Sequence, residues 1–433
     1  MIEYFFSFSG KKRKNVDGRN SNGRINGADQ SGPETFTVPC NLHIDMELVQ
    51  VEEMDIYSQY KYQDYKWLVD YSFCALLVYL LIEVAGYLRP QVFSDEFSIG
   101  FVWCGMVVFF AIKDLLSLTA AYWRSADSGE RSMTISFGFF FLVVAMGVLV
   151  IDEDILDFGL NEGYANFTSN LLNVYKKLDF QVESTPSIWS FKILLAIFAA
   201  FIGAISGFPG IRYANVHLDS LTYAAETPHW QAVYHFSFLC PLMLSLLWIS
   251  PLSKDLVVPS SRSDPKGKIQ ISAAMFDAIR IHAVPFFCII RLLLSRRFLQ
   301  SYLNSAYQKV EKMKKERGRI TNLELQRKVA RVFYYLSAAA LQYIAPMLLL
   351  LFAGLMYRTL TYNMTASGEL SVTYDVIANM TSNREETKEY AKLIRSLFTV
   401  ELVRGIFSFI TWWCLVAFFV TSCFGVVYLK YLS

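Results

Sequence analysis

The chain is dominated by long apolar stretches, and these restrict its fold more than any other feature. A helix that crosses about 30 Å of hydrocarbon needs about 20 mostly apolar residues. Eight windows meet this requirement: 67–88, 97–117, 132–151, 191–213, 233–252, 276–295, 332–357 and 402–428. Lipid offers no hydrogen bonds to a polypeptide backbone, so each window must satisfy its own N–H and C=O groups as a helix. The sequence therefore predicts an all-α, polytopic membrane helix bundle of about eight transmembrane helices.

Composition supports this interpretation. Charged residues make up 18% of the chain and apolar residues 54%, whereas ordinary soluble chains carry roughly 25% charged residues. The sixth window is the weakest, because it contains Asp277, Arg280, His282 and Arg291, and its uncharged core, 283–290, is short. A re-entrant or interfacial segment is the alternative there.

Two signals predict the orientation. The connection 296–331 holds eleven Lys and Arg residues and three Glu, and such basic connections face the cytoplasm. Glycosylation acceptors of the Asn-X-Ser/Thr type occur at Asn166, Asn363 and Asn379, and glycans are added on the lumenal side. Counted from the basic connection, all three acceptors fall on the opposite side. Eight spans then place both termini in the cytoplasm, in either the plasma membrane or an endomembrane.

These features divide the chain into four parts. Residues 1–66 form a polar, cytosolic and largely disordered region. Residues 67–295 hold the first six spans, with an acidic lumenal loop at 152–190. Residues 296–331 form the basic cytosolic connection. Residues 332–433 hold the last two spans, with a glycosylatable lumenal loop at 358–401.

The basic connection is predicted to be helical. Phe298, Tyr302, Ala306, Val310 and Met313 recur at spacings of three and four, which gives one apolar face among basic side chains. A basic amphipathic helix beside a membrane can bind anionic lipid, here over 296–317, or the cytosolic face of a partner protein. A solvated connector is the alternative. Thr321 to Glu324 matches a capping box, which predicts a second helix start.

Ionisable groups inside spans are candidate functional residues, because hydrocarbon makes them costly. They are Asp70, Glu83, Lys113, Asp114, Arg280 and His282. We expect Asp70 to pair with Lys113, since adjacent antiparallel spans place them at similar depth. Glu83 could pair with Arg280 or His282 if spans one and six touch. Such charges can fix helix register, form an ion or proton path, or extend to the interface.

The fourth span contains small residues that allow close packing and a residue that disturbs helices. Gly203 and Gly207 are one turn apart, and Pro209 is expected to kink or end the helix. Prolines also interrupt spans five, six and seven, at Pro241, Pro285 and Pro346. Broken helices occur at transporter binding sites, although packing irregularity is the more common cause.

Familiar channel and catalytic signatures do not occur in the sequence. It has no potassium-channel filter, voltage sensor, P-loop, HExxH or GxSxG pattern. We therefore expect no enzyme, cofactor, metal site or nucleic-acid partner. His217, Asp219, Glu226 and His229 fall in one predicted cytosolic loop, and their spacing fits no familiar metal site.

Many separate blocks of the sequence, in one order, resemble the transmembrane protein 161 family. The blocks are WLVD at 67–70, VYL at 78–80 with Glu83, FAIK at 110–113, GERS at 129–132, FGFFF at 137–141, FPGIR at 208–212, HLD at 217–219, RVFYY at 331–335, QY at 342–343 with AP at 345–346, and TWW at 411–413. The chain departs from the family at its N-terminus, where relatives usually carry a further apolar segment that residues 1–8 do not supply; a shortened form is one explanation.

The resemblance implies a multi-pass protein associated with control of cation currents and membrane excitability, and with protection against oxidative stress. It carries over no catalytic or ligand residue. We therefore expect a regulator of K⁺ or Ca²⁺ currents that acts through a partner channel. A transporter or channel in its own right is the first alternative, and a stress-protective membrane protein is the second.

Overall fold

The computed structural model describes residues 4–7, 47–50, 53–88, 99–124, 128–177, 186–257, 272–315, 322–367 and 399–431. Within these residues, eight helices are long and apolar enough to cross a membrane. They are α2 (Tyr62–Leu88), α4 (Ile99–Trp123), α5 (Ser128–Val150), α7 (Ile188–Tyr223), α8 (Pro228–Ser245), α10 (Ala273–Lys315), α12 (Leu336–Ser367) and α15 (Val400–Tyr431). Each coincides with one predicted span, including the weak sixth, so the fold prediction is confirmed.

Shorter elements complete the described part of the chain. They are the strands β1 (Tyr4–Ser7) and β2 (Glu47–Gln50), the 3-10 turn η1 (Leu246–Trp248), and the helices α1 (Glu53–Tyr57), α6 (Leu160–Lys177), α9 (Lys254–Val257) and α11 (Asn322–Tyr334). The two strands pair antiparallel, with Tyr4 opposite Gln50. These strands, α1 and the first turn of α2 all lie within the polar N-terminal region.

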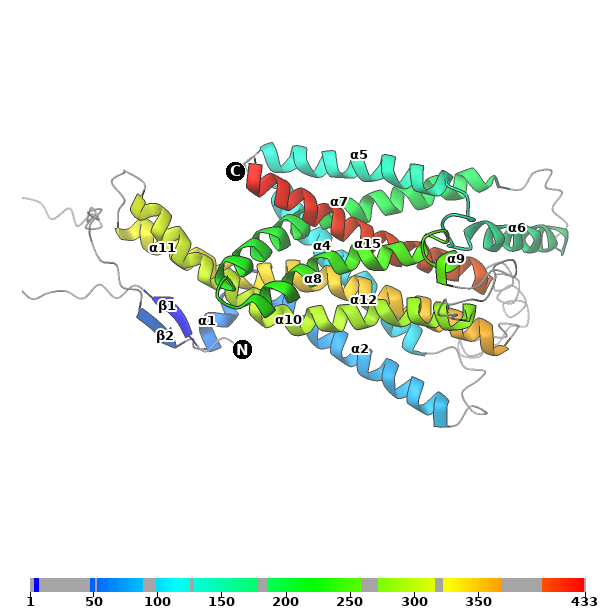
Figure 1. The fold of residues 1–433 in the computed structure, drawn as a ribbon, viewed down its shortest axis with the longest axis horizontal. Coiled ribbons are helices and arrows are strands. Elements are labelled where there is room, and N and C mark those ends of the chain that lie inside the picture. The colour runs from blue at the N-terminus through cyan, green and yellow to red at the C-terminus, as the bar shows by residue number, and fades with distance from the viewer. Residues whose placement is uncertain are drawn as a thin grey trace, which may run out of the picture.

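The helix α12 lies at the centre of the bundle (Figure 1). It contacts α2, α4, α7, α10 and α15. The whole of its most apolar stretch is buried, whereas only 17% of the corresponding stretch of α5 is buried. The run from Met347 to Met356 supplies this apolar filling. An apolar helix therefore occupies the axis of the bundle, and the outer helices present their apolar side chains outward, as a lipid environment requires.

The two orientation signals lie at opposite ends of the bundle. Figure 1 shows α11, the C-terminal end of α10 and the chain's C-terminus at one end, and α6 and α9 at the other. Asn166 lies in α6, and Asn363 lies in the last turns of α12, at the end remote from α11. Asn379 lies outside the described residues. The basic connection and two of the three acceptors are thus separated by the length of the bundle.

Glycines allow α7 to approach its neighbours closely. A Cβ atom at Gly203 would overlap the Phe141 ring of α5, and one at Gly207 would lie 2.7 Å from the Phe137 ring. The helix does not end at Pro209, as the sequence suggested it could, but continues to Tyr223. One consequence is that His217, expected in a solvated loop, lies inside α7 and is only 4% exposed.

The basic connection begins as a direct continuation of the sixth span. Its predicted apolar face is present, and Phe298, Tyr302, Ala306 and Val310 are at most 5% exposed. These side chains pack inside the bundle, so this face is covered by the chain itself. The helix α11 begins at Asn322, where the capping box predicted a start. Binding of anionic lipid by the outer basic side chains stays a prediction.

Candidate functional site

The first predicted pair, between Asp70 and Lys113, is not formed. The Lys113 ammonium lies 3.1 Å from the carboxylate of its neighbour Asp114, which is 4% exposed. Asp70 lies on an exposed position of α2. The depth argument was sound for two antiparallel helices, but depth does not determine which way each side chain faces around its helix axis.

Glu83 does form an ion pair, with an arginine that is not among the predicted partners. A carboxylate oxygen of Glu83 on α2 lies 2.9 Å from Nη1 of Arg358 on α12. The same guanidinium donates to the Tyr79 hydroxyl at 2.7 Å and to Nε2 of His282 at 3.3 Å. Glu83 and His282 therefore both contact Arg358 and not each other, so the predicted pairing of Glu83 with His282 or Arg280 is wrong.

Arg280 belongs to a different network, at the end of the bundle that holds α6. Its guanidinium, 6% exposed, lies 3.1 Å from Asp157 and 3.0 Å from Asp277. Lys254 approaches the same Asp157 carboxylate at 3.5 Å. The loop that carries Asp157 is held by the buried Trp248, whose carbonyl accepts from the Asp157 backbone N–H at 3.2 Å.

Asp157 is the ionisable centre of this network. Burial would raise the pKa of its carboxyl, but the positive charges of Arg280 and Lys254 outweigh burial and hold that pKa below its usual range. An ionised Asp157 therefore joins α10 and α9 to the loop between α5 and α6. These ion pairs stabilise one end of the bundle.

The most unusual ionisable group is Arg291, at the middle of α10. Its side chain is completely buried. The guanidinium carbon lies 3.9 Å from the Tyr213 ring centre and 4.3 Å from that of Phe418, with Phe287 and Tyr343 further out. Among the described residues, none of its side-chain nitrogens makes a hydrogen bond of good geometry, although the Tyr343 hydroxyl lies near enough to interact with the guanidinium. Aromatic side chains from α7, α15 and α12 thus surround the cation, and no carboxylate of the described chain pairs with it.

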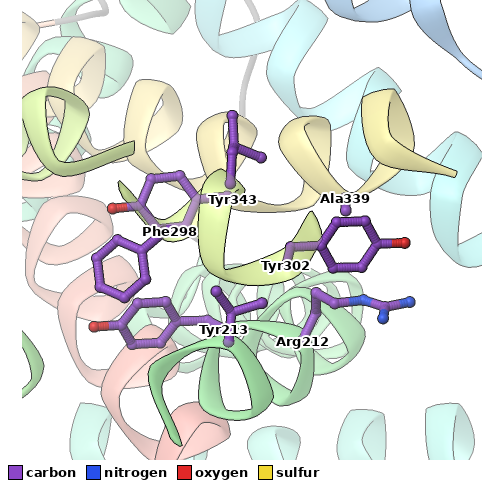
Figure 2. Close-up of a pocket in the computed structure, with 8 residues that line it drawn as sticks. Arg212, Tyr213, Phe298, Tyr302, Ala339 and Tyr343 are labelled. Carbon is purple, nitrogen blue, oxygen red and sulfur yellow. The ribbon is translucent and has the colours of Figure 1, made fainter. Parts of the chain in front are cut away.

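A small pocket is lined in part by Tyr213 and Tyr343, but not by Arg291. Its free volume is about 10 Å³, room for about one water molecule. Figure 2 shows Arg212 and Tyr302 on one side of the pocket and Tyr213, Phe298 and Tyr343 on the other. Arg212 donates to Gln342 at 3.2 Å, and Gln342 donates to the Tyr122 hydroxyl at 2.8 Å. Such a pocket is too small for an organic substrate.

Metal ligation finds no support within the part of the chain that the structure describes. No group of three or more His, Cys, Asp and Glu side chains there could hold a metal ion. His217 and His235 lie near each other, with ring centres 5.8 Å apart, but the His217 ring faces Phe238 and Tyr213 rather than a carboxylate.

A protein-family model described as "Predicted transmembrane protein 161AB" matches residues 4–433. The chain belongs to this family. The match includes the weak sixth span and both charge networks, and it agrees with the resemblance seen in the sequence. No solved structure matches the chain. In this member of the family, the charges around α12 are therefore the main structural guide to function.

Sequence reasoning missed two residues that organise these charges. Arg358 lies directly after the predicted seventh span, where a basic residue ordinarily extends to the interface. Arg291 was noted only as a weakness of the sixth span. A useful signal was available for Arg291, because a charge inside a span, without an acid at i±3 or i±4, indicates a partner on another helix.

Proposed function

We propose that this multi-pass membrane protein regulates cation currents by binding a partner channel, and that it does not itself conduct ions. The filling of the bundle axis by α12 carries this proposal. A pore along that axis needs polar or water-lined positions, and the central stretch of α12 consists of buried Leu, Phe, Ala and Met side chains.

The pairing of the intramembrane charges supports the same conclusion. Glu83 is neutralised by Arg358, and Asp114 by Lys113. A transporter would use such carboxylates to bind a solute or a proton, and it would need them to face a water-filled path. The Glu83–Arg358 pair joins α2 to α12 and so fixes how these two helices pack, which suits a protein that presents a fixed surface to a partner.

The first experiment compares channel currents with and without this protein. We expect its co-expression to change the amplitude or voltage dependence of a K⁺ or Ca²⁺ channel, measured by whole-cell recording. Surface labelling of the channel separates an effect on gating from an effect on trafficking. Unchanged currents across a panel of both channel classes would remove the proposal.

The second experiment tests the transporter alternative directly. Purified protein in liposomes should conduct no K⁺, Na⁺ or Ca²⁺ above the level of empty liposomes. If it does conduct, Glu83→Gln should abolish the flux while Glu226→Gln, in the connection between α7 and α8, should leave it unchanged. That result would make the protein a transporter and overturn the proposal.

A further inference from the structure

Asp70 is a carboxylate inside a span that the described chain leaves without a partner. The other carboxylates of the spans, Glu83, Asp114 and Asp277, each lie within 3.1 Å of a basic side chain. Asp70 makes no ion pair and no side-chain hydrogen bond with the described residues, and it lies at an exposed position of α2. Charged groups inside a span ordinarily face the bundle and pair there. The position of Asp70 therefore calls for an explanation.

A ring contact next to Asp70 shows its depth in the bundle. The ring centres of Tyr71 on α2 and Phe110 on α4 are 5.2 Å apart. Asp70 is the ninth residue of α2, about 12 Å along the axis from Tyr62, at the end that the orientation signals assign to the cytoplasm. The carboxylate is thus level with the apolar part of α4 around Phe110.

The surface around Asp70 is apolar and faces outward. Trp67 and Phe73, one turn to either side on α2, and Phe109 of α4 are each at least 62% exposed. The helix α2 lies at the edge of the bundle and packs mainly against α4 and α12 (Figure 1). An aspartate has no long apolar stem with which to reach the membrane surface. Asp70 therefore places a carboxylate on a lipid-facing surface.

A second copy of this chain does not supply a matching cation. The exposed basic side chains nearest to this depth are Lys66 and Lys113. The Lys113 ammonium is already held at 3.1 Å by the buried carboxylate of Asp114. Lys66 lies one turn nearer the end of α2, and a lysine at such a position extends its ammonium into water. Charge complementarity thus favours a cation from another protein.

We propose that the face of α2 around Asp70 binds a transmembrane helix of another protein, one that carries a lysine or arginine at the depth of Asp70. The cation forms a charge-assisted hydrogen bond with the carboxylate. Trp67, Phe73 and Phe109 keep water from the pair, which strengthens the attraction. This inference rests on the proposed function and deepens it, because it names the face that binds the partner and the charge that the partner carries.

The test uses the purified full chain in phosphatidylcholine vesicles and a model transmembrane helix. The probe is a leucine–alanine peptide of about 24 residues with one Lys about two turns from one end, and matched peptides carry Gln or Glu there. Energy transfer from a donor on the C-terminus of the chain to an acceptor on the peptide measures association. We expect the Lys peptide to bind about fivefold more tightly than the Gln peptide. Equal binding of the two would overturn the proposal.

Variants of the chain locate the binding face. Asp70→Asn should abolish the preference for the Lys peptide, and Asp70→Lys should transfer the preference to the Glu peptide. Glu83→Gln removes a carboxylate of the same helix that is already paired, and it should keep the preference for Lys. Because Asp70 is exposed, the unfolding midpoints of its variants should match wild type, which separates lost binding from misfolding. A preference for Lys that survives Asp70→Asn would refute this face.

Self-association is tested in the same vesicles with chains that carry either the donor or the acceptor. Energy transfer between copies that is lost in Asp70→Asn would assign the face to a second copy and overturn the proposal. The peptide contains no channel, so its binding does not depend on any effect on currents. Unchanged currents together with Asp70-dependent peptide binding would reject the proposed function and support this docking face.

Discussion

The carboxylate of Glu83 and the guanidinium of Arg358 meet at 2.9 Å, although 275 residues separate them in the chain. The contact joins α2, the first span, to α12, the central one. The Tyr79 hydroxyl, which accepts from the same guanidinium, is within 3.3 Å of Thr359 Oγ1. One ion pair therefore connects an outer helix to the apolar axis.

Breaking this pair should loosen α2. Glu83→Gln removes the charge but keeps the size, and charge-assisted hydrogen bonds contribute about 1.5–3 kcal/mol. Because the Glu83 side chain is 40% exposed, solvent screening reduces this contribution, and we expect a loss of about 1 kcal/mol. Thermal unfolding in detergent measures it. The exchanged pair Glu83→Arg with Arg358→Glu should recover part of the loss, and a double variant less stable than both single variants would contradict the assignment.

The network around Asp157 predicts a dependence on pH. Burial acts to raise the pKa of its carboxyl, but Arg280 and Lys254 outweigh burial and hold that pKa below the ordinary value of about 3.9. A lowered folded-state pKa contributes stability that is fully present above the unfolded-state value and is lost as pH falls through the folded-state value. The stability difference between wild type and Asp157→Asn should therefore be constant from about pH 5 to 8 and shrink below about pH 4. A difference that grows on acidification would show that the sign is wrong.

The spans could be predicted from the sequence because hydrocarbon thickness and backbone hydrogen bonding require long apolar helices. Even the sixth, which carries Arg280 and Arg291, forms one continuous helix. Contacts between spans could not be predicted in the same way. Which residue of α12 meets Glu83 depends on how each helix is rotated about its axis, and the all-apolar central surface of α12 gives no periodic signal for that rotation.

The apolar face of the basic connection illustrates a related limit. Its periodicity correctly predicted a helix with Phe298 and Tyr302 on one face. The pattern cannot say whether such a face contacts lipid, a partner or the chain's own core, because all three bury the same side chains. The structure places Tyr302 against Arg212, with the guanidinium 5.6 Å from the ring centre.

The orientation of the bundle can be tested with glycosylation. If the end that holds α6 is lumenal, Asn166→Gln and Asn363→Gln should each remove one glycan, seen as a mobility shift lost after glycosidase treatment. Asn166 already donates from its side-chain amide to Glu401, so its glycan should be the less complete of the two. An Asn-X-Thr acceptor introduced at 316–318 should stay unmodified. A glycan there would invert the predicted topology.

The contact between α5 and α7 predicts opposite effects for the same substitution at two glycines. A methyl group on Gly203 would overlap both the ring and the Cβ atom of Phe141, a completely buried side chain. Overpacking of this kind costs about 1–3 kcal/mol. Gly147 lies further along α5 than Phe141, and a methyl group placed on it would have no neighbouring atom within 4 Å. Gly147→Ala should therefore be neutral or stabilise by up to about 1 kcal/mol through helix propensity.

Unfolding midpoints of the two variants, measured side by side in one detergent, should move in opposite directions or differ by several degrees. Equal midpoints would mean that α5 does not pack on α7 through Gly203, and the close approach of these helices would have to be abandoned.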